Sequence, residues 1–430
     1  MKTNVISHLG ITTEGKDKMA LTMTQKAVEP RHDFFSKLMG PGMRATTISY
    51  IEWRRSVLLV RNRGEPEPAM PKNFVPSSIQ LDLTTACNSD CPGCIDFAIL
   101  NQKETHNYAQ LLETIQYMIS RGLRSVILIG GGEPAIHPKF REVVHFLKDH
   151  GLQVAIVSNG LFHAPILDVA SLLTPPDWLR ISLDAGSDPT FQTLRRPRHP
   201  TTLEEVCSLA REIRELNPDL PIGYSFVVSW PGAKDTRGDP LPQNIDEIVL
   251  AAELAEASGF SYISVKAYLQ RSLTGSEAID PEAIKNFDAT IERIGHEIAQ
   301  ARKLAKGGFE VIVSKNLRAL MDGTWRRYMN QPRTCHKQAL QWVISPLGTY
   351  NCPAWRGNPK ALITDSAPFS NRKAGDTLKA VARIIDGFDA KTECSKIVCF
   401  YNDLNWGLES IINGDDDLPP GEIFASDCFL

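Results

Sequence analysis

The chain has 430 residues, and its 47 basic and 50 acidic side chains leave a formal charge of −3. This near-neutral balance argues against a dedicated nucleic-acid-binding protein, and the 42% hydrophobic content excludes a disordered or collagen-like chain. No segment reaches the roughly 18 apolar residues of a membrane helix, and the first residues lack the apolar stretch of a signal peptide. We therefore expect a cytoplasmic protein of two or three domains with reduced cysteines and no membrane or nucleic-acid partner.

Residues 1–75 are expected to form an N-terminal extension and linker. Its first 45 residues are polar and weakly patterned, which is typical of a partly ordered tail. Residues 48–60 favour a structured element, because Trp53 and Val57 lie among its apolar positions. The prolines between residues 66 and 76 favour an extended linker.

Residues 76–270 alternate between short apolar segments and amphipathic segments. Strands are predicted at 79–83, 125–129, 154–157, 179–183, 222–228 and 263–267, with helical patterns between them. Such alternation predicts an α/β fold in which helices cover a parallel sheet through right-handed crossovers. In sheets of this kind functional residues gather at the carboxyl ends of the strands.

The alternation is expected to stop beyond residue 270. Residues 271–330 are predicted to form a helical connection, because apolar residues from Ile284 to Ile298 recur at intervals of three and four. Residues 331–430 are rich in cysteine, with little helical periodicity outside 380–385. Acidic residues and a Pro-Pro pair near the end suggest an exposed tail, although Cys428 lies beyond them.

The strongest chemical motif is Cys87-x-x-x-Cys91-x-x-Cys94, directly after the first strand. Three thiolates on one loop can converge on a small metal centre, and thiolate ligation suits zinc or iron–sulfur. A closed structural zinc site needs four ligands, and no further Cys or His follows until His106. Three thiolates on a 4Fe–4S cluster leave one iron free to bind a substrate or cofactor.

This motif, its place after the first strand and the sequence Gly130-Gly131-Gly132-Glu133-Pro134 after the second resemble the radical S-adenosylmethionine (SAM) superfamily. The cysteine-rich end resembles the branch with a SPASM or twitch domain. The resemblance covers about residues 78–400 and implies a partial (β/α)6 TIM-like barrel with a C-terminal cysteine-rich auxiliary iron–sulfur domain. It implies a catalytic 4Fe–4S cluster whose open iron binds SAM. Reductive cleavage of SAM then gives a 5′-deoxyadenosyl radical that abstracts a substrate hydrogen atom.

The resemblance also assigns SAM contacts to polar residues at the strand ends. Glu133 matches the acceptor for the methionyl amine, the Ser-Asn-Gly turn after the third strand matches a Thr-Asn-Gly turn, and either Arg195 or Arg196 resembles the arginine that meets the methionyl carboxylate. Gly93 departs from the family, because many members carry an aromatic residue there. The residues implied in SAM binding are Gly93, Gly131, Gly132, Glu133, Ser158, Asn159, Ser182, Asp184, Arg195 and Arg196.

A second cysteine group lies in residues 331–430. Cys335, Gly348 and Cys352 resemble the hairpin that opens a SPASM or twitch domain, one residue shorter than its usual form. The resemblance implies an auxiliary 4Fe–4S cluster on Cys335, Cys352, Cys394 and Cys399, with Cys428 either spare or replacing one of the last pair. A structural zinc site and unliganded thiols are the alternatives.

Five further residues are interpreted from their positions. His336 is expected to be a neighbour of the second cysteine group rather than a ligand, and Cys207, in a helical pattern, is expected to be buried and inert. Tyr224, Lys266 and Tyr268 are candidates to face the barrel opening. No residue is assigned as catalytic.

The resemblance implies a radical SAM enzyme that oxidises, epimerises or forms a bond in a natural-product small molecule or a ribosomal peptide. An electron donor such as flavodoxin or ferredoxin is implied as a partner. The alternative hypothesis is a zinc-stabilised, non-catalytic α/β binding protein.

Overall fold

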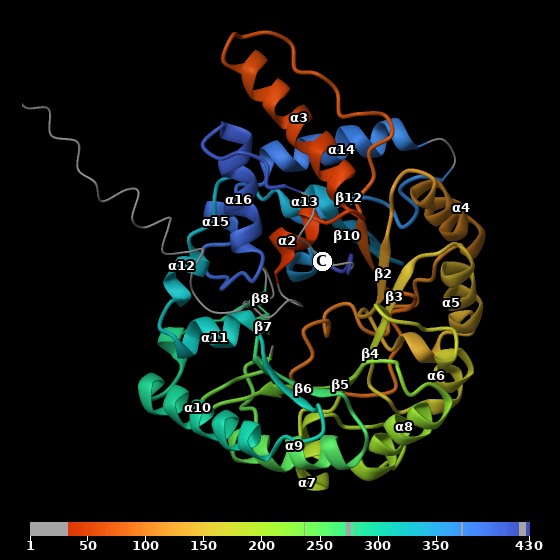
Figure 1. The fold of residues 1–430 in the computed structure, drawn as a ribbon, viewed down its shortest axis with the longest axis vertical. Helices are drawn as coiled ribbons and strands as arrows, with labels where there is room; N and C mark the ends of the chain where they lie inside the picture. The colour runs from red at the N-terminus through yellow and green to blue at the C-terminus, as the bar shows by residue number, and fades with distance from the viewer. Residues whose placement is uncertain (1–32, 236, 272–276, 280, 371–372, 421–426) are drawn as a thin grey trace, which may run out of the picture. The chain divides into compact units, whose positions relative to one another are not determined.

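A ten-stranded sheet in the order β12-β11-β10-β1-β2-β3-β4-β5-β6-β9 is the centre of the computed structural model (Figure 1). The structure describes residues 33–430 except 236, 272–276, 280, 371–372 and 421–426. The parallel strands are β1 (Ser78–Leu81), β2 (Ser125–Leu128), β3 (Gln153–Ser158), β4 (Trp178–Ser182), β5 (Ile222–Val228), β6 (Tyr262–Ala267), β9 (Glu310–Val313) and β10 (Gln341–Ser345). The antiparallel strands β11 (Gly348–Tyr350) and β12 (Leu362–Thr364) complete it.

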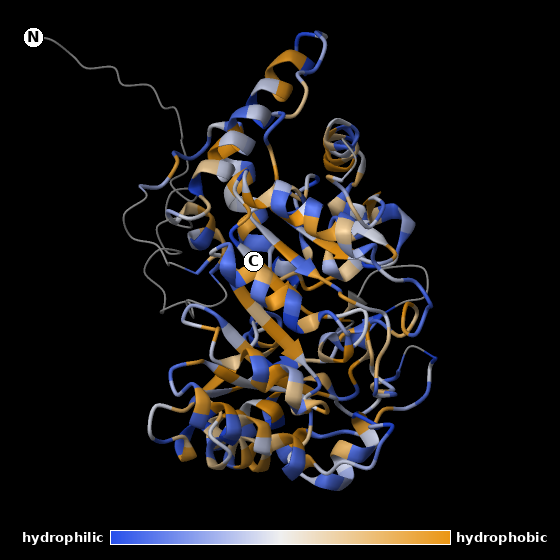
Figure 2. Cartoon of the chain, turned by 90° about the vertical axis from the view of Figure 1, so that its right-hand side faces the viewer, coloured by the Kyte–Doolittle hydropathy of each residue, from blue (hydrophilic) through white to orange (hydrophobic). Residues whose placement is uncertain are grey.

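Helices cover the convex side of this curved sheet, as Figure 1 shows. They are α4 (Tyr108–Ile119), α5 (Phe140–Asp149), α6 (His163–Ala170), α8 (Leu203–Leu216), α9 (Ile248–Ala257) and α10 (Phe287–Leu304). In α4, Leu111, Ile115 and Met118 are buried and lie three or four residues apart, so they form one apolar stripe against the sheet. Figure 2 shows the same pattern throughout, with hydrophobic strands and helices of mixed character. The parallel α/β fold predicted from the sequence is confirmed.

The parallel alternation does not stop at residue 270 as expected. After β6 the chain forms the hairpin β7 (Gln270–Arg271) and β8 (Glu277–Ala278), then α10, and then β9, which pairs in parallel with β6. The sequence concealed this unit because β9 has only four residues and follows Gly307-Gly308. The strand β10 pairs in parallel with β1, so the cysteine-rich region extends the same sheet.

The C-terminal region contains more helix than its sequence suggested. Its helices are α11 (Lys315–Met321), α12 (Trp325–Met329), α13 (Lys337–Leu340), α14 (Ala374–Gly387), α15 (Ala390–Glu393) and α16 (Asn402–Asn413). Structure also begins earlier than expected, at α2 (Phe34–Met39) and α3 (Arg44–Arg61), while residues 1–32 of the expected tail lie outside the described residues. None of the described helices combines the length and the hydrophobicity that crossing a membrane requires.

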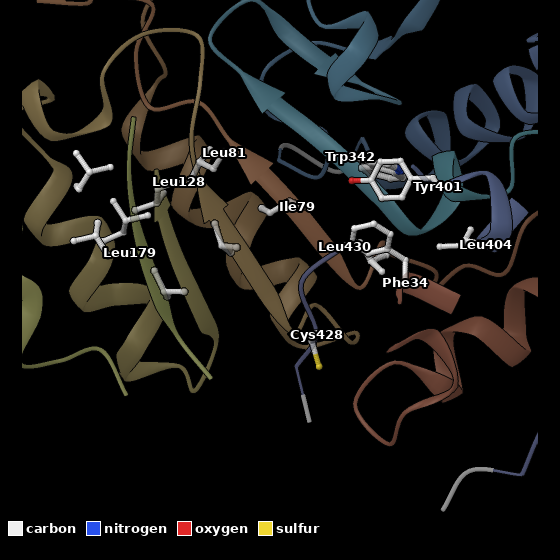
Figure 3. Packing of buried hydrophobic residues seen from close by; sticks show 14 of the residues in the cluster. Phe34, Ile79, Leu81, Leu128, Leu179, Trp342, Tyr401, Leu404, Cys428 and Leu430 are labelled. Atoms are coloured by element: carbon white, nitrogen blue, oxygen red, sulfur yellow. The ribbon is translucent and has the colours of Figure 1, made fainter. Parts of the chain in front are cut away.

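The end of the chain is buried rather than exposed. Cys428, Phe429 and Leu430 are each at most 5% exposed and lie beside the first strands, as Figure 3 shows for Cys428 and Leu430 near Ile79. Ser125 at the start of β2 donates to the Cys428 carbonyl (2.6 Å), and the Cys428 amide donates to Gln153 at the start of β3 (2.7 Å). The last residues therefore close the amino ends of the strands.

Candidate active site

The first cysteine loop lies at the carboxyl ends of the strands. The Cys91 thiol donates to the Arg195 carbonyl (3.2 Å), and the Asn159 amide lies 3.9 Å from the Cys87 sulfur. Cys94 interacts electrostatically with both other thiols. Burial raises the pKa of Cys87 to about 11 and also raises those of Cys91 and Cys94. Metal ligation requires the thiolate, so these thiols need a strongly electrophilic centre to lose their protons.

The arrangement of the cysteines does not favour binding of a single metal ion. Within the part of the chain that the structure describes, no three His, Cys, Asp or Glu side chains are grouped to hold one metal ion. A cubic cluster spaces its sulfur ligands more widely than a single ion does, because each thiolate binds a different iron.

Arg195 supplies a buried donor beside these thiols. Its guanidinium interacts electrostatically with Cys87, Cys91 and Cys94, and its Nη1 donates to Asp184 (3.0 Å). Its Nε is buried and has no hydrogen-bond partner. A buried donor without a partner is costly, so the arrangement fits an anionic ligand such as the methionyl carboxylate of SAM. Arg196 is exposed, and its Nε donates to the Thr193 carbonyl (3.2 Å).

Glu133 is buried and joins the second strand end to the third. Its carboxylate accepts hydrogen bonds from Ser158 Oγ (2.7 Å), the Asn159 amide (2.7 Å) and the Ala135 amide (3.0 Å). A carboxylate offers about four lone pairs, so one acceptor position is left for a ligand ammonium group. Beside it, a Cβ at Gly132 would lie 1.9 Å from the Ala86 carbonyl oxygen. Only glycine allows this close packing of the turn on the cysteine loop.

Asp184 is held by the protein on both carboxylate oxygens. One accepts from the Val227 amide (2.8 Å) and the other from Arg195, and its backbone has a positive φ of 58°. Asn244 contributes to the same turn by donating to the Asp184 carbonyl (2.8 Å), and it does not cap the following helix through its side chain. Ser182, which the resemblance also implies in SAM binding, is half-buried at the end of β4.

Tyr268 occupies space beside Gly93. An ideal Cβ at Gly93 would lie 3.1 Å from the Tyr268 ring, and the Tyr268 hydroxyl donates to the Lys234 carbonyl (3.0 Å). The aromatic ring that Gly93 lacks is therefore present at this position from the residue after β6. Tyr224 instead faces away from the site: it is fully buried, its ring packs edge-on against Phe260, and its hydroxyl donates to the Ala185 carbonyl (2.5 Å).

The second cysteine group converges in the C-terminal region. Cys394 interacts electrostatically with Cys335, Cys352 and Cys399, and burial raises its pKa well above the ordinary value. Lys337 is fully buried beside three of these thiols, and burial lowers its pKa while the thiols oppose that shift. A buried ammonium group needs nearby negative charge. Four thiolates with such a cation fit an iron–sulfur cluster in chemistry and number.

His336 and Cys428 have other partners. Both ring nitrogens of His336 are engaged, one with the Tyr50 hydroxyl (2.7 Å) and one with Glu409 (2.6 Å). Cys428 interacts electrostatically with Lys37, Arg124 and Asp427. Cys207 is free and fully buried in α8, as its helical pattern predicted.

A buried charge network joins the two cysteine regions, and sequence reasoning missed it. Arg356, four residues after Cys352, pairs with Asp96 (2.7 Å) and Asp82 (3.0 Å) and donates to Gln80 (3.0 Å). Burial raises the pKa of Asp82 to about 7, and Arg356 opposes that shift. No spacing rule marks these residues, because the pairing connects positions about 270 residues apart.

Residues 81–237 match the family model described as the Radical SAM superfamily. The match identifies residues 81–237 as a radical SAM domain. The chain is 24% identical over 253 residues to an S-adenosylmethionine-dependent nucleotide dehydratase of Selenomonas ruminantium, covering 57% of this chain and 86% of that protein. It is 25% identical over 260 residues to a tRNA-2-methylthio-N(6)-dimethylallyladenosine synthase of Clostridium beijerinckii, covering 56% of this chain and 54% of that protein.

Solved structures share the fold of this chain. Streptococcus suis SuiB matches with a TM-score of 0.53 and 13% identity over 85% of this chain and 83% of SuiB. A histidine-tagged form of anSMEcpe with bound AdoMet matches with a TM-score of 0.52 and 12% identity over 79% of this chain and 97% of that chain. The resemblance to the radical SAM superfamily is confirmed, and this family implies a 4Fe–4S cluster and SAM as cofactors. The auxiliary cluster stays a prediction.

Proposed function

We propose that Cys87, Cys91 and Cys94 hold the catalytic 4Fe–4S cluster and that SAM binds between this cluster and Arg195. The observation that carries this proposal is the buried, unpartnered Nε of Arg195, beside three converging thiols. Arg195 binds the carboxylate of SAM, and the free acceptor position of Glu133 receives its ammonium group. When bound, cluster and SAM together supply a 5′-deoxyadenosyl radical that abstracts a substrate hydrogen atom.

The remaining predicted SAM residues act mainly by shaping the site. Ser158 and Asn159 orient Glu133, and Asp184 orients Arg195. Gly131 and Gly132 permit the close approach of the turn to the cysteine loop. Tyr268 supplies the aromatic surface that Gly93 does not, while Gly93 offers its backbone and Ser182 its hydroxyl to the adenosyl group.

The C-terminal region is proposed to carry an auxiliary 4Fe–4S cluster on Cys335, Cys352, Cys394 and Cys399. Lys337 supports this assignment, because its buried ammonium interacts with three of the thiols. A second cluster suits a reaction that removes an electron from the substrate, such as oxidation or bond formation. We propose the domain limits 76–270 for the barrel, 271–330 for the connection and 331–430 for the auxiliary domain, after an extension at 1–75.

The substrate is proposed to be a small molecule or a peptide of natural-product metabolism, and epimerisation is a further reaction type open to the site. SuiB, which shares the fold, has been crystallised with its precursor peptide SuiA, and one relative is named for a nucleotide. A reduced flavodoxin or ferredoxin in the cytoplasm is the proposed electron donor.

The decisive experiment is anaerobic reconstitution followed by reduction with dithionite in the presence of SAM. The wild type is expected to bind about eight irons and release 5′-deoxyadenosine. Cys91→Ala is expected to reduce that release at least ~1,000-fold, because the cluster loses a ligand. Cys207→Ala is the matched control, since this buried thiol lies in α8 away from both cysteine groups. Undiminished release by Cys91→Ala would refute the site.

A further inference from the structure

The side chains on the concave face of β4, β5 and β6 form a polar layer below the cysteine loop. Strand register places Ser182 beside Ser225 and Ser225 beside Ser264, so three hydroxyls lie at one level. Arg180 lies one layer closer to the amino ends of the strands, and Lys266 one layer closer to the carboxyl ends. Alternate residues of a strand point to opposite faces, so all five share the face turned away from the covering helices.

Two cations in this layer have no acidic partner. Lys266 Nζ donates to Ser225 Oγ (2.9 Å), and this neutral hydroxyl is the partner that the structure gives it. The Nε of Arg180 is buried without a hydrogen-bond partner, and its guanidinium lies 5.2 Å from the centre of the Trp178 ring. Among the described residues neither cation forms an ion pair. Asp184, the nearest acidic group to act on Lys266, is already paired with Arg195.

The pKa values of both side chains are shifted against their charged forms. Burial lowers the pKa of Lys266 well below its ordinary value, and the neighbouring Arg180 lowers it further. Burial also lowers the pKa of Arg180. Both side chains are half-buried, and the Nε of Arg180 is a buried donor without a hydrogen-bond partner. Two like charges held on one face without an acidic partner are unfavourable in the protein alone. Their presence here is explained by a ligand that brings the missing charge.

The layer is accessible from one side only. Toward the amino ends of the strands, Phe429 packs with Ile127 and Ala155 against Trp178, and its ring meets that of Trp178 edge-on at 5.6 Å. This apolar floor is formed by the last residues of the chain. A ligand that reaches Arg180 and Lys266 therefore enters from the carboxyl ends of the strands, where the cysteine loop lies.

We propose that Arg180 and Lys266, with the hydroxyls of Ser225 and Ser264, bind a dianionic phosphate group carried by the substrate. This inference rests on the proposed function, because it places the anchored part of the substrate beneath the SAM site. A dianion balances two cations, whereas a single carboxylate leaves one charge unpaired. Guanidinium, ammonium and hydroxyl donors suit the several oxygen atoms of a phosphate. The anchored group holds the reacting part of the substrate toward the cysteine loop.

The test is calorimetric titration of the reconstituted, oxidised protein with inorganic phosphate and, separately, with acetate. The wild type is expected to bind one phosphate per chain and to bind acetate at least tenfold more weakly. Arg180→Met and Lys266→Met are each expected to weaken phosphate binding at least tenfold. Arg211→Met is the matched control, because Arg211 is an exposed arginine on α8; its phosphate affinity should equal that of the wild type.

Thermal unfolding separates a binding role from a structural one. Lys266→Met is expected to raise the midpoint in phosphate-free buffer, because it removes a half-buried charge without an acidic partner, and phosphate should raise the midpoint of the wild type but not of the variant. A lowered midpoint with unchanged phosphate affinity would overturn the proposal, and so would tighter binding of acetate than of phosphate. Phosphate titration needs no reduced cluster, so its failure is distinguishable from failure of SAM cleavage.

Discussion

The two ends of the parallel strands are built in opposite ways. At the amino ends, Ser125 and Gln153 hydrogen-bond the backbone of Cys428, and Phe429 fills an apolar pocket that it shares with Trp178. At the carboxyl ends, Arg195 keeps a buried donor without a partner, and three half-buried cysteines have raised pKa values.

One end of the sheet therefore contributes to stability, and the other end is suited to ligand binding. Polar groups at the amino ends find their partners inside the chain, so this end contributes to folding. Unpartnered polar groups at the carboxyl ends cost free energy in the protein alone and become satisfied only by a ligand. The buried network of Arg356, Asp82 and Asp96 lies at the carboxyl end as well, and connects the two cysteine regions there.

The largest expected effect distinguishes two cysteines of the C-terminal region. Cys335→Ala should lower bound iron from about eight to about four per chain, because one 4Fe–4S cluster loses a ligand. Cys428→Ala should leave the iron content unchanged, since this thiol lies against Gly42 beneath the strands. Iron analysis after anaerobic reconstitution measures both. Equal loss of iron in the two variants would contradict the auxiliary site.

The sequence placed the first cysteine loop and the glycine turn at one edge of the sheet, and for a physical reason. Cysteine spacing and glycine turns are local properties, and the period of two in the strands places them at one edge of the sheet. The fold class followed from the same periodicity. The choice between Arg195 and Arg196 required coordinates, because neighbouring residues of one loop diverge according to backbone angles that the sequence does not contain.

The missed features all depend on long-range contacts. The pairing of β10 with β1 joins residues more than 250 positions apart, as does the contact of Cys428 with Ser125. The burial of the chain end was not predicted from the sequence. Residues 428–430 are too few to show a hydrophobic periodicity. Tyr224 was wrongly expected near the opening because its strand register was not known.

A second prediction concerns the amino ends of the strands, which the last residues of the chain cover. Phe429→Ala should lower the free energy of unfolding by about 3–5 kcal/mol, because it leaves a cavity between Ile127, Ala155 and Trp178. Phe162 is 46% exposed, so Phe162→Ala should cost less than about 1 kcal/mol. Urea denaturation of both variants beside the wild type measures the difference. If both substitutions lower the free energy of unfolding equally, the last residues do not pack against the amino ends of the strands in solution.

The smallest expected effect tests the Arg195 guanidinium at the carboxyl ends of the strands. Arg195→Gln should weaken SAM binding to the oxidised, reconstituted enzyme about tenfold or more, because a charge-assisted contact with the carboxylate is lost. Arg196→Gln should bind SAM like the wild type, because the Arg196 side chain is exposed and donates to the Thr193 carbonyl. Calorimetric titration with SAM compares them at equal cluster content. Because the two arginines are adjacent, an effect of loop charge alone would weaken SAM binding in both variants. Weaker SAM binding in Arg196→Gln alone would reverse the assignment.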